Sequence, residues 1–186
     1  MSAETHPSDA GSTAGDRAIA RSVLVVDDST LQRKILGSLL SRWGFTVLEA
    51  ATAEAGLDIC RSSPPDFVIS DWMMPGMSGP EFCVAFRELE RESYGYFLLL
   101  TSKSEKTEIA RGLDAGADDF LTKPVNSEEL RARLTAGERI LAMQSELVEK
   151  NRLVTDTLNK MNALYESVDR DLQQARKLQQ SLVKER

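Results

Sequence analysis

The segment VLVVDDS, residues 23–29, is a short apolar run that ends on two adjacent acids. A second apolar run, residues 66–70, ends on Asp71 in the same way. Strands that alternate with helices predict a parallel sheet with right-handed crossovers. The sequence therefore predicts an α/β fold with a five-stranded, doubly wound parallel sheet. Its strands are expected at 22–26, 45–49, 66–70, 96–100 and 118–122, and its helices at 31–43, 52–60, 80–92, 106–115 and from 127 onward.

Polar side chains stand where the predicted strands end: Asp27, Asp28, Asp71, Thr101 and Lys123. In an open parallel sheet, ligands bind outside the carboxyl ends of the strands. Three carboxylates at one edge repel one another, and a hard cation such as Mg²⁺ stabilises such a cluster. One carboxylate can then attack an electrophilic phosphorus, while the lysine and the threonine bind phosphoryl oxygens. The pattern predicts a phosphoryl-transfer site. In the alternative interpretation, Asp27 and Asp28 only cap the following helix.

Four segments of the chain resemble the response-regulator receiver domains of two-component signalling. They occur in the order and spacing of that family across about residues 21–142, and together they are far more specific than any single motif. The resemblance implies a flavodoxin-like fold, and a sensor histidine kinase or phosphotransfer protein as the phosphodonor. The segments are VLVVDDS (23–29), DFVISDWMMPGMSG (66–79), LLLTS (98–102) and AGADDFLTKPV (115–125).

The same resemblance implies a role for each residue at the strand ends. Asp71 is the phosphoacceptor. Asp28 and Asp71 bind Mg²⁺ through their side chains, Asp27 acts mainly through a water molecule, and Met73 contributes its backbone carbonyl. The remaining matches are the switch hydroxyl (Thr101), the aromatic that turns inward with it (Phe120, which also fits a core position), the phosphate-binding lysine (Lys123) and a proline after a cis bond (Pro124).

Two residues near the predicted site depart from the best-studied small receivers. Met73 lies two residues after the acceptor, and Lys103 lies two residues after Thr101. Polar or acidic side chains often occupy these places and orient the water that hydrolyses the acyl phosphate. A thioether cannot orient that water, and a lysine can instead pair with the phosphoryl group. Slow self-dephosphorylation is therefore expected.

Composition narrows the class of protein. The net charge is −6 and no basic stripe offsets it, so a nucleic-acid partner is not expected. No apolar run approaches the roughly 18 residues of a membrane span, and residues 1–20 read as a disordered tail rather than a secretory signal. Cys60 and Cys83 lie in apolar surroundings and read as buried, reduced thiols, which favours a cytoplasmic protein.

A long helix is predicted from residue 127 to the end of the chain, with Asn126 or Ser127 at its start. The receiver is expected to cover residues 21–142, and residues 143–186 form a coiled-coil continuation of its last helix. A buried amide such as Asn151 favours two-stranded, parallel pairing, so a homodimer is expected. The alternative is a helix that folds back on the receiver or frays. The predicted dimer positions are Leu147, Asn151, Val154, Leu158, Met161, Tyr165, Val168 and Leu172, within a heptad series that runs from Ile140 to Leu182.

Three functions follow from this sequence. The first is a phosphorylated switching module that acts through its coiled coil and is not itself an enzyme. The second is the N-terminal part of a larger regulator whose output is a metal-dependent serine phosphatase or a diguanylate cyclase, because the C-terminal segment resembles the helical linkers of such proteins. No catalytic motif for either output is present. The third, a dehalogenase-like phosphatase, is disfavoured because its two acids should be separated by one residue, whereas Asp27 and Asp28 are adjacent.

Overall fold

The computed structural model describes residues 21–102 and 106–184. Five strands form one parallel sheet, as predicted, and their order is β2-β1-β3-β4-β5. In chain order the elements are β1 (Ser22–Val26), α1 (Thr30–Arg42), β2 (Thr46–Ala50), α2 (Ala53–Ser62), β3 (Phe67–Asp71), α3 (Gly79–Arg87), β4 (Tyr96–Thr101), α4 (Lys106–Asp114), β5 (Asp119–Thr122) and α5 (Ser127–Lys184).

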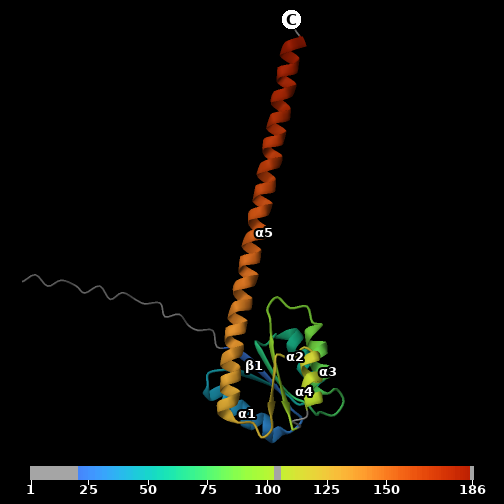
Figure 1. Cartoon of the computed structure of the whole chain (residues 1–186), viewed down its shortest axis with the longest axis vertical. Coiled ribbons are helices and arrows are strands. Elements are labelled where there is room, and N and C mark those ends of the chain that lie inside the picture. The colour runs from blue at the N-terminus through green and yellow to red at the C-terminus, as the bar shows by residue number, and fades with distance from the viewer. Residues whose placement is uncertain (1–20, 103–105, 185–186) are drawn as a thin grey trace, which may run out of the picture.

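Helices cover both faces of the sheet, and the alternation of side chains along each strand divides the core in two. On β1, Val23 and Val25 point toward α1 and α5, where they meet Leu36 and Leu134. The intervening Leu24 and Val26 point toward the opposite face, which α2 and α3 cover with residues such as Leu57 and Phe82. Figure 1 shows α1 and α5 on one side of the sheet and α2, α3 and α4 on the other.

One helix ends earlier than predicted. The pattern 80–92 suggested a helix to residue 92, but α3 ends at Arg87. Arg91 instead turns back, donates from Nη2 to the backbone carbonyl of Pro65 at 2.6 Å and stacks over the ring of Phe86. These tertiary contacts outweigh the local helical pattern and shape residues 88–95 into a loop that leads into β4.

The C-terminal helix is a single element of 58 residues. The side-chain amide oxygen of Asn126 accepts from the backbone N–H groups of Glu128 and Glu129, which caps its start as predicted. Leu130, Leu134 and Leu141 are buried against the sheet. Gly137 allows this close approach, since an added Cβ would lie 2.7 Å from the ring of Phe67.

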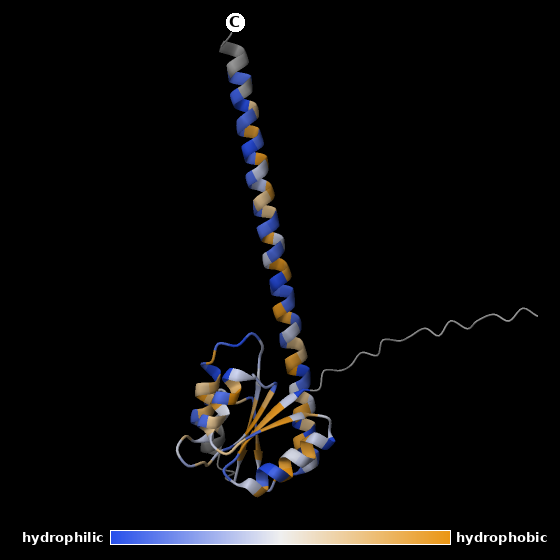
Figure 2. Cartoon of the chain, turned by 180° about the vertical axis from the view of Figure 1, so that it is seen from behind, coloured by the Kyte–Doolittle hydropathy of each residue, from blue (hydrophilic) through white to orange (hydrophobic). Residues whose placement is uncertain are grey.

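Beyond the sheet, α5 projects alone from the edge opposite the carboxyl ends of the strands (Figure 1). From residue 145 to residue 177 every side chain is exposed. Hydrophobic residues nevertheless recur along this stretch, as Figure 2 shows. They include Leu147, Val154, Leu158, Met161, Tyr165, Val168 and Leu172. Among the described helices, none is both long enough and apolar enough to cross a membrane.

Candidate functional site

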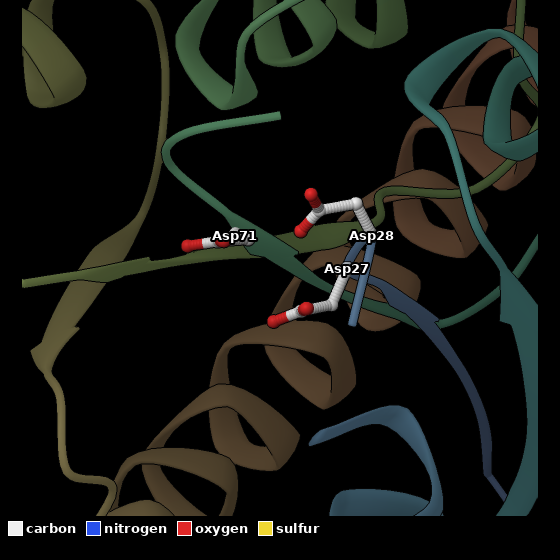
Figure 3. Close-up of side chains that lie close together, drawn as sticks. All are labelled: Asp27, Asp28 and Asp71. Carbon is white, nitrogen blue, oxygen red and sulfur yellow. The ribbon is translucent and has the colours of Figure 1, made fainter. Parts of the chain in front are cut away.

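Three carboxylates meet at the carboxyl edge of two neighbouring strands (Figure 3). Asp27 and Asp28 follow the end of β1, and the paired strand β3 ends on Asp71. One oxygen of each residue lies within 4.8 Å of the others. Asp27 and Asp71 are 1% and 8% exposed, whereas Asp28 is open to solvent. The connections of β1 and β3 run to opposite sides of this point, so the cluster lies at the topological switch point of the sheet.

Lys123 reaches the same cluster from the end of β5. Its Nζ lies 2.9 Å from Oδ1 of Asp71 and 3.1 Å from Oδ2 of Asp27. Burial disfavours the charged ammonium, but the hydrogen bonds and charges of Asp71 and Asp27 outweigh burial and raise the pKa of Lys123 above its ordinary value. The lysine therefore stays protonated at neutral pH and neutralises part of the acidic charge.

Backbone and side-chain donors hold Asp27 in place. Its Oδ1 accepts from the backbone N–H of Ser29 at 2.8 Å, and its backbone carbonyl accepts from Nη1 of Arg33 at 2.5 Å. Ser29, rather than either aspartate, is the N-cap of α1, because its side chain accepts from the N–H of Gln32. The interpretation of Asp27 and Asp28 as simple helix caps is therefore wrong. Sequence reasoning missed Arg33, whose only signal was its position one turn into α1.

The other predicted site residues lie around the cluster at different depths. Thr101 is 2% exposed at the end of β4, next to the strand that carries Asp71. Phe120, on β5, is half-buried against the core under α2 and α3. Met73 is 62% exposed, and the Lys123–Pro124 peptide bond is cis, as the resemblance implied. Lys103 lies outside the described residues.

The donor set suits a hard, oxygen-binding cation. Three carboxylates within 4.8 Å carry more negative charge than one ammonium offsets, and Asp28 leaves one side of the cluster accessible to water. Mg²⁺ binds through one or two carboxylates and keeps several water ligands. The residues present therefore fit such an ion. With a bound cation and a protonated lysine, the edge can stabilise the negative charge of a phosphoryl group.

The family of the chain follows from comparison with known proteins. The profile of the response regulator receiver domain matches residues 23–135, which is more than half of the chain. The chain belongs to this family. The matched part of the receiver contains the whole acidic cluster, Lys123 and the beginning of α5.

In sequence, the receiver is similar to the phosphate regulon transcriptional regulatory protein PhoB of Escherichia coli. The two are 34% identical over 143 residues, which cover 74% of this chain and 61% of that regulator. The transcriptional regulatory protein AfsQ1 of Streptomyces coelicolor is 37% identical over 122 residues, which cover 63% of this chain and 53% of AfsQ1. The chain thus spans no more than about three fifths of these curated relatives.

In structure, the receiver is similar to the chemotaxis protein CheY4 of Vibrio cholerae. The TM-score is 0.60 at 32% sequence identity, over 63% of this chain and 98% of that chain. A probable two-component system response regulator/GGDEF domain protein is similar with a TM-score of 0.61 at 29% identity, over 66% of this chain and 50% of that one. The flavodoxin-like architecture predicted from the sequence is confirmed.

Proposed function

We propose that this receiver accepts a phosphoryl group on Asp71 from the phosphohistidine of a sensor histidine kinase or phosphotransfer protein. The observation that supports the proposal most directly is the position of Lys123, whose Nζ contacts both Asp71 and Asp27 inside the acidic cluster. A carboxylate at a strand end, with a lysine and a cation-binding acid beside it, has the groups that phosphoryl transfer requires.

In the proposed transfer, a carboxylate oxygen of Asp71 forms a bond to phosphorus as the phosphorus–nitrogen bond of the donor breaks. The imidazole nitrogen leaves with the electron pair and takes up a proton. Asp28 and Asp71, with the Met73 carbonyl and a water held by Asp27, are the proposed Mg²⁺ ligands. When bound, Mg²⁺ offsets the charge on the phosphoryl oxygens. Lys123 binds one phosphoryl oxygen, and Thr101, with Phe120 following it, closes on another.

We further propose that the signal leaves through α5. The division into a receiver at 21–142 and a coiled-coil segment at 143–186 fits the point at which α5 loses contact with the sheet. The apolar residues on the protruding part are solvent-exposed in a single chain, and a second α5 in parallel would cover them. The expected coupling between phosphorylation and helix pairing is about 1–3 kcal/mol, the usual size of a two-site coupling. A cytoplasmic location and the absence of a nucleic-acid partner belong to the same proposal.

A larger regulator is the second candidate. The chain covers half of the probable response regulator/GGDEF domain protein to which it is similar. An output domain after α5, a diguanylate cyclase or a serine phosphatase, would then be driven by the same helix pair. Within the chain itself the receiver acts as a phosphoacceptor and not as an output enzyme.

Phosphorylation of the full chain tests the proposal. Incubation with Mg²⁺ and acetyl phosphate should add one phosphoryl group, found on Asp71 by peptide mass spectrometry. Asp71→Asn should abolish the addition, because an amide is neither a nucleophile nor a good metal ligand, whereas the exposed Asp58→Asn should leave it unchanged. Asp28→Asn should weaken Mg²⁺ binding more than Asp27→Asn. Full phosphorylation of the Asp71→Asn protein would overturn the assignment.

A further inference from the structure

An open groove of about 340 Å³ lies where α5 leaves the receiver, at the edge of the sheet opposite Asp71. The loop between α3 and β4 forms one wall, with Leu89, Ser93 and Tyr94. The helix forms the other wall, with Gln144 and Val148. Both views of the chain show this loop beside the base of the protruding helix (Figures 1 and 2).

The loop wall is held by interactions within the receiver, so the groove exists before any partner binds. Arg87 donates to the carbonyls of Gly95 and Gly116 and pairs with Asp118. The hydroxyl of Tyr94 donates to the same Asp118 carboxylate. These contacts fix the loop at both of its ends and leave the groove as a preformed surface.

The helix wall coincides with the side of α5 on which a second helix would pack. In the heptad that places Leu147 and Asn151 in the seam, Gln144 is also a seam residue. Val148 directly follows Leu147 and flanks the seam. A second α5 must therefore approach α5 beside this groove. The groove and the exposed apolar stripe above it form one continuous surface.

The polar residues of the seam select parallel pairing. The seam consists of two alternating series of positions, and Asn151 belongs to the series that contains Gln144 and Leu158. In antiparallel coiled coils, a residue of one series faces a residue of the other series on the second helix. The other series is apolar throughout: Ile140, Leu147, Val154, Met161, Val168, Ala175 and Leu182. Antiparallel pairing would bury the Asn151 amide without a partner, which is unfavourable, whereas parallel pairing in register places it opposite a second Asn151.

Parallel pairing then determines what lies next to the groove. In a parallel coiled coil, heptad position g of one helix, just before a seam residue, lies opposite position e of the next heptad on the other helix. Val148 occupies such an e position. The residue opposite Val148 is therefore Met143 of the second chain. Met143 is 62% exposed in its own chain, and a flexible thioether adapts well to an irregular groove.

We propose that Met143 of a second copy of this chain inserts into the groove between the α3–β4 loop and α5, so that each receiver holds the partner's helix as well as its own. This inference rests on the proposed dimer and adds a receiver-to-helix contact to it. The loop continues directly into β4, the strand that ends on Thr101. A second copy thereby contacts the loop that leads into the strand carrying the switch hydroxyl.

Cross-linking between two differently tagged full-length chains tests the contact. One chain carries Met143→Cys and the other Ser93→Cys, and a short bismaleimide should join them. Leu153→Cys, exposed on the same helix but outside the seam, should not couple to Ser93→Cys. The native Cys60 and Cys83 are buried, and burial raises the pKa of their thiols to about 11 and about 12, so they react slowly at neutral pH.

Leu158→Cys in both chains reports the helix pair itself, and this separates the two proposals. If the 158 pair cross-links while the 143–93 pair does not, the groove contact is wrong and the coiled coil stands. If neither pair forms and the protein sediments as a monomer, both the contact and the dimer are overturned, while phosphorylation of Asp71 is measured independently. As a second readout, Met143→Glu should weaken dimerisation on the order of tenfold, the loss of one interface anchor, and Leu153→Glu should not.

Discussion

Replacing Asp28 by asparagine should stabilise the metal-free receiver and reduce the stability that it gains when Mg²⁺ binds. The substitution keeps the size of the side chain and removes one negative charge from a cluster whose oxygens lie within 4.8 Å of one another. Lys123 pairs with the other two members, Asp27 and Asp71. In the absence of a cation, Asp28 therefore adds electrostatic repulsion at the carboxyl edge of the sheet, where the Lys123 ammonium already pairs with Asp27 and Asp71.

The size of the effect follows from the separation and the exposure. At 4.8 Å, two unit charges repel by about 0.9 kcal/mol in the dielectric of bulk water and by about 3.5 kcal/mol at an effective dielectric constant of 20. Asp28 is solvent-exposed, so the lower figure applies to each of its two pairs. Attraction to the Lys123 ammonium offsets part of that sum. We expect Asp28→Asn to raise the free energy of unfolding by about 1 kcal/mol without Mg²⁺.

Urea unfolding, followed by tryptophan fluorescence with EDTA and then with saturating Mg²⁺, measures both effects. The wild-type protein should gain up to about 2.7 kcal/mol at a hundredfold excess over the dissociation constant, and Asp28→Asn should gain clearly less. Asp156→Asn, an exposed change on the protruding helix, is the matched control and should alter neither value. A metal-free Asp28→Asn protein that is less stable than wild type would show that the cluster is not repulsive, and the cation argument would fail with it.

Three further perturbations probe other parts of the molecule. Because the thioether of Met73 cannot orient water, combining Met73→Asn with Lys103→Glu should shorten the lifetime of the acyl phosphate. The loss of phosphorylated protein with time on a phosphate-affinity gel measures this lifetime, and an equal or longer lifetime would refute the argument. Gly137→Ala should lower the free energy of unfolding by about 1 kcal/mol, since overpacking against Phe67 costs about 1–3 kcal/mol and the helix preference for alanine returns about 1; a more stable variant in urea would contradict the close approach. The pKa of Lys123 is raised, so the stability that its ion pairs contribute should be fully present below the ordinary lysine pKa of about 10.4 and lost as pH rises through the pKa of the folded state. The difference in free energy of unfolding between wild type and Lys123→Met, measured in urea from neutral pH upward, should therefore shrink only above a pH of about 10.4.

The residues at the strand ends could be predicted because their placement is a property of topology. Once apolar runs alternate with helices, parallel pairing brings every carboxyl end to one edge, and Asp27, Asp71 and Lys123 must approach one another. The sequence could not reveal which helix caps or tertiary donors support them. Ser29 takes the N-cap of α1 and Arg33 reaches back to the Asp27 carbonyl, and both depend on the local path of the chain.

The early end of α3 also depends on tertiary contacts that the local sequence pattern does not report. Residues 88–92 have helical composition, but Arg91 donates to the carbonyl of Pro65, which is distant in sequence, and lies over the ring of Phe86. Sequence periodicity reports which face of an element is apolar, but it does not report competition from a segment distant in sequence. The groove beside α5 exists because this loop replaces the predicted helical turns, so sequence analysis had no access to it.

The path of α5 limits how phosphorylation can act on helix pairing. Leu134 and Leu141 face the sheet and Ile140 packs partly against the same core, whereas Leu147 lies in the exposed part of the seam. Neighbouring residues on a helix point about 100° apart, so the seam lies beside the buried face rather than on it. Two chains can therefore pair without unpacking α5 from either receiver. In the proposed dimer, a change at Thr101 would then act on helix pairing by tilting or rotating an intact helix. A mechanism that frees α5 from the sheet would expose Leu130 and Leu134 for no gain in pairing.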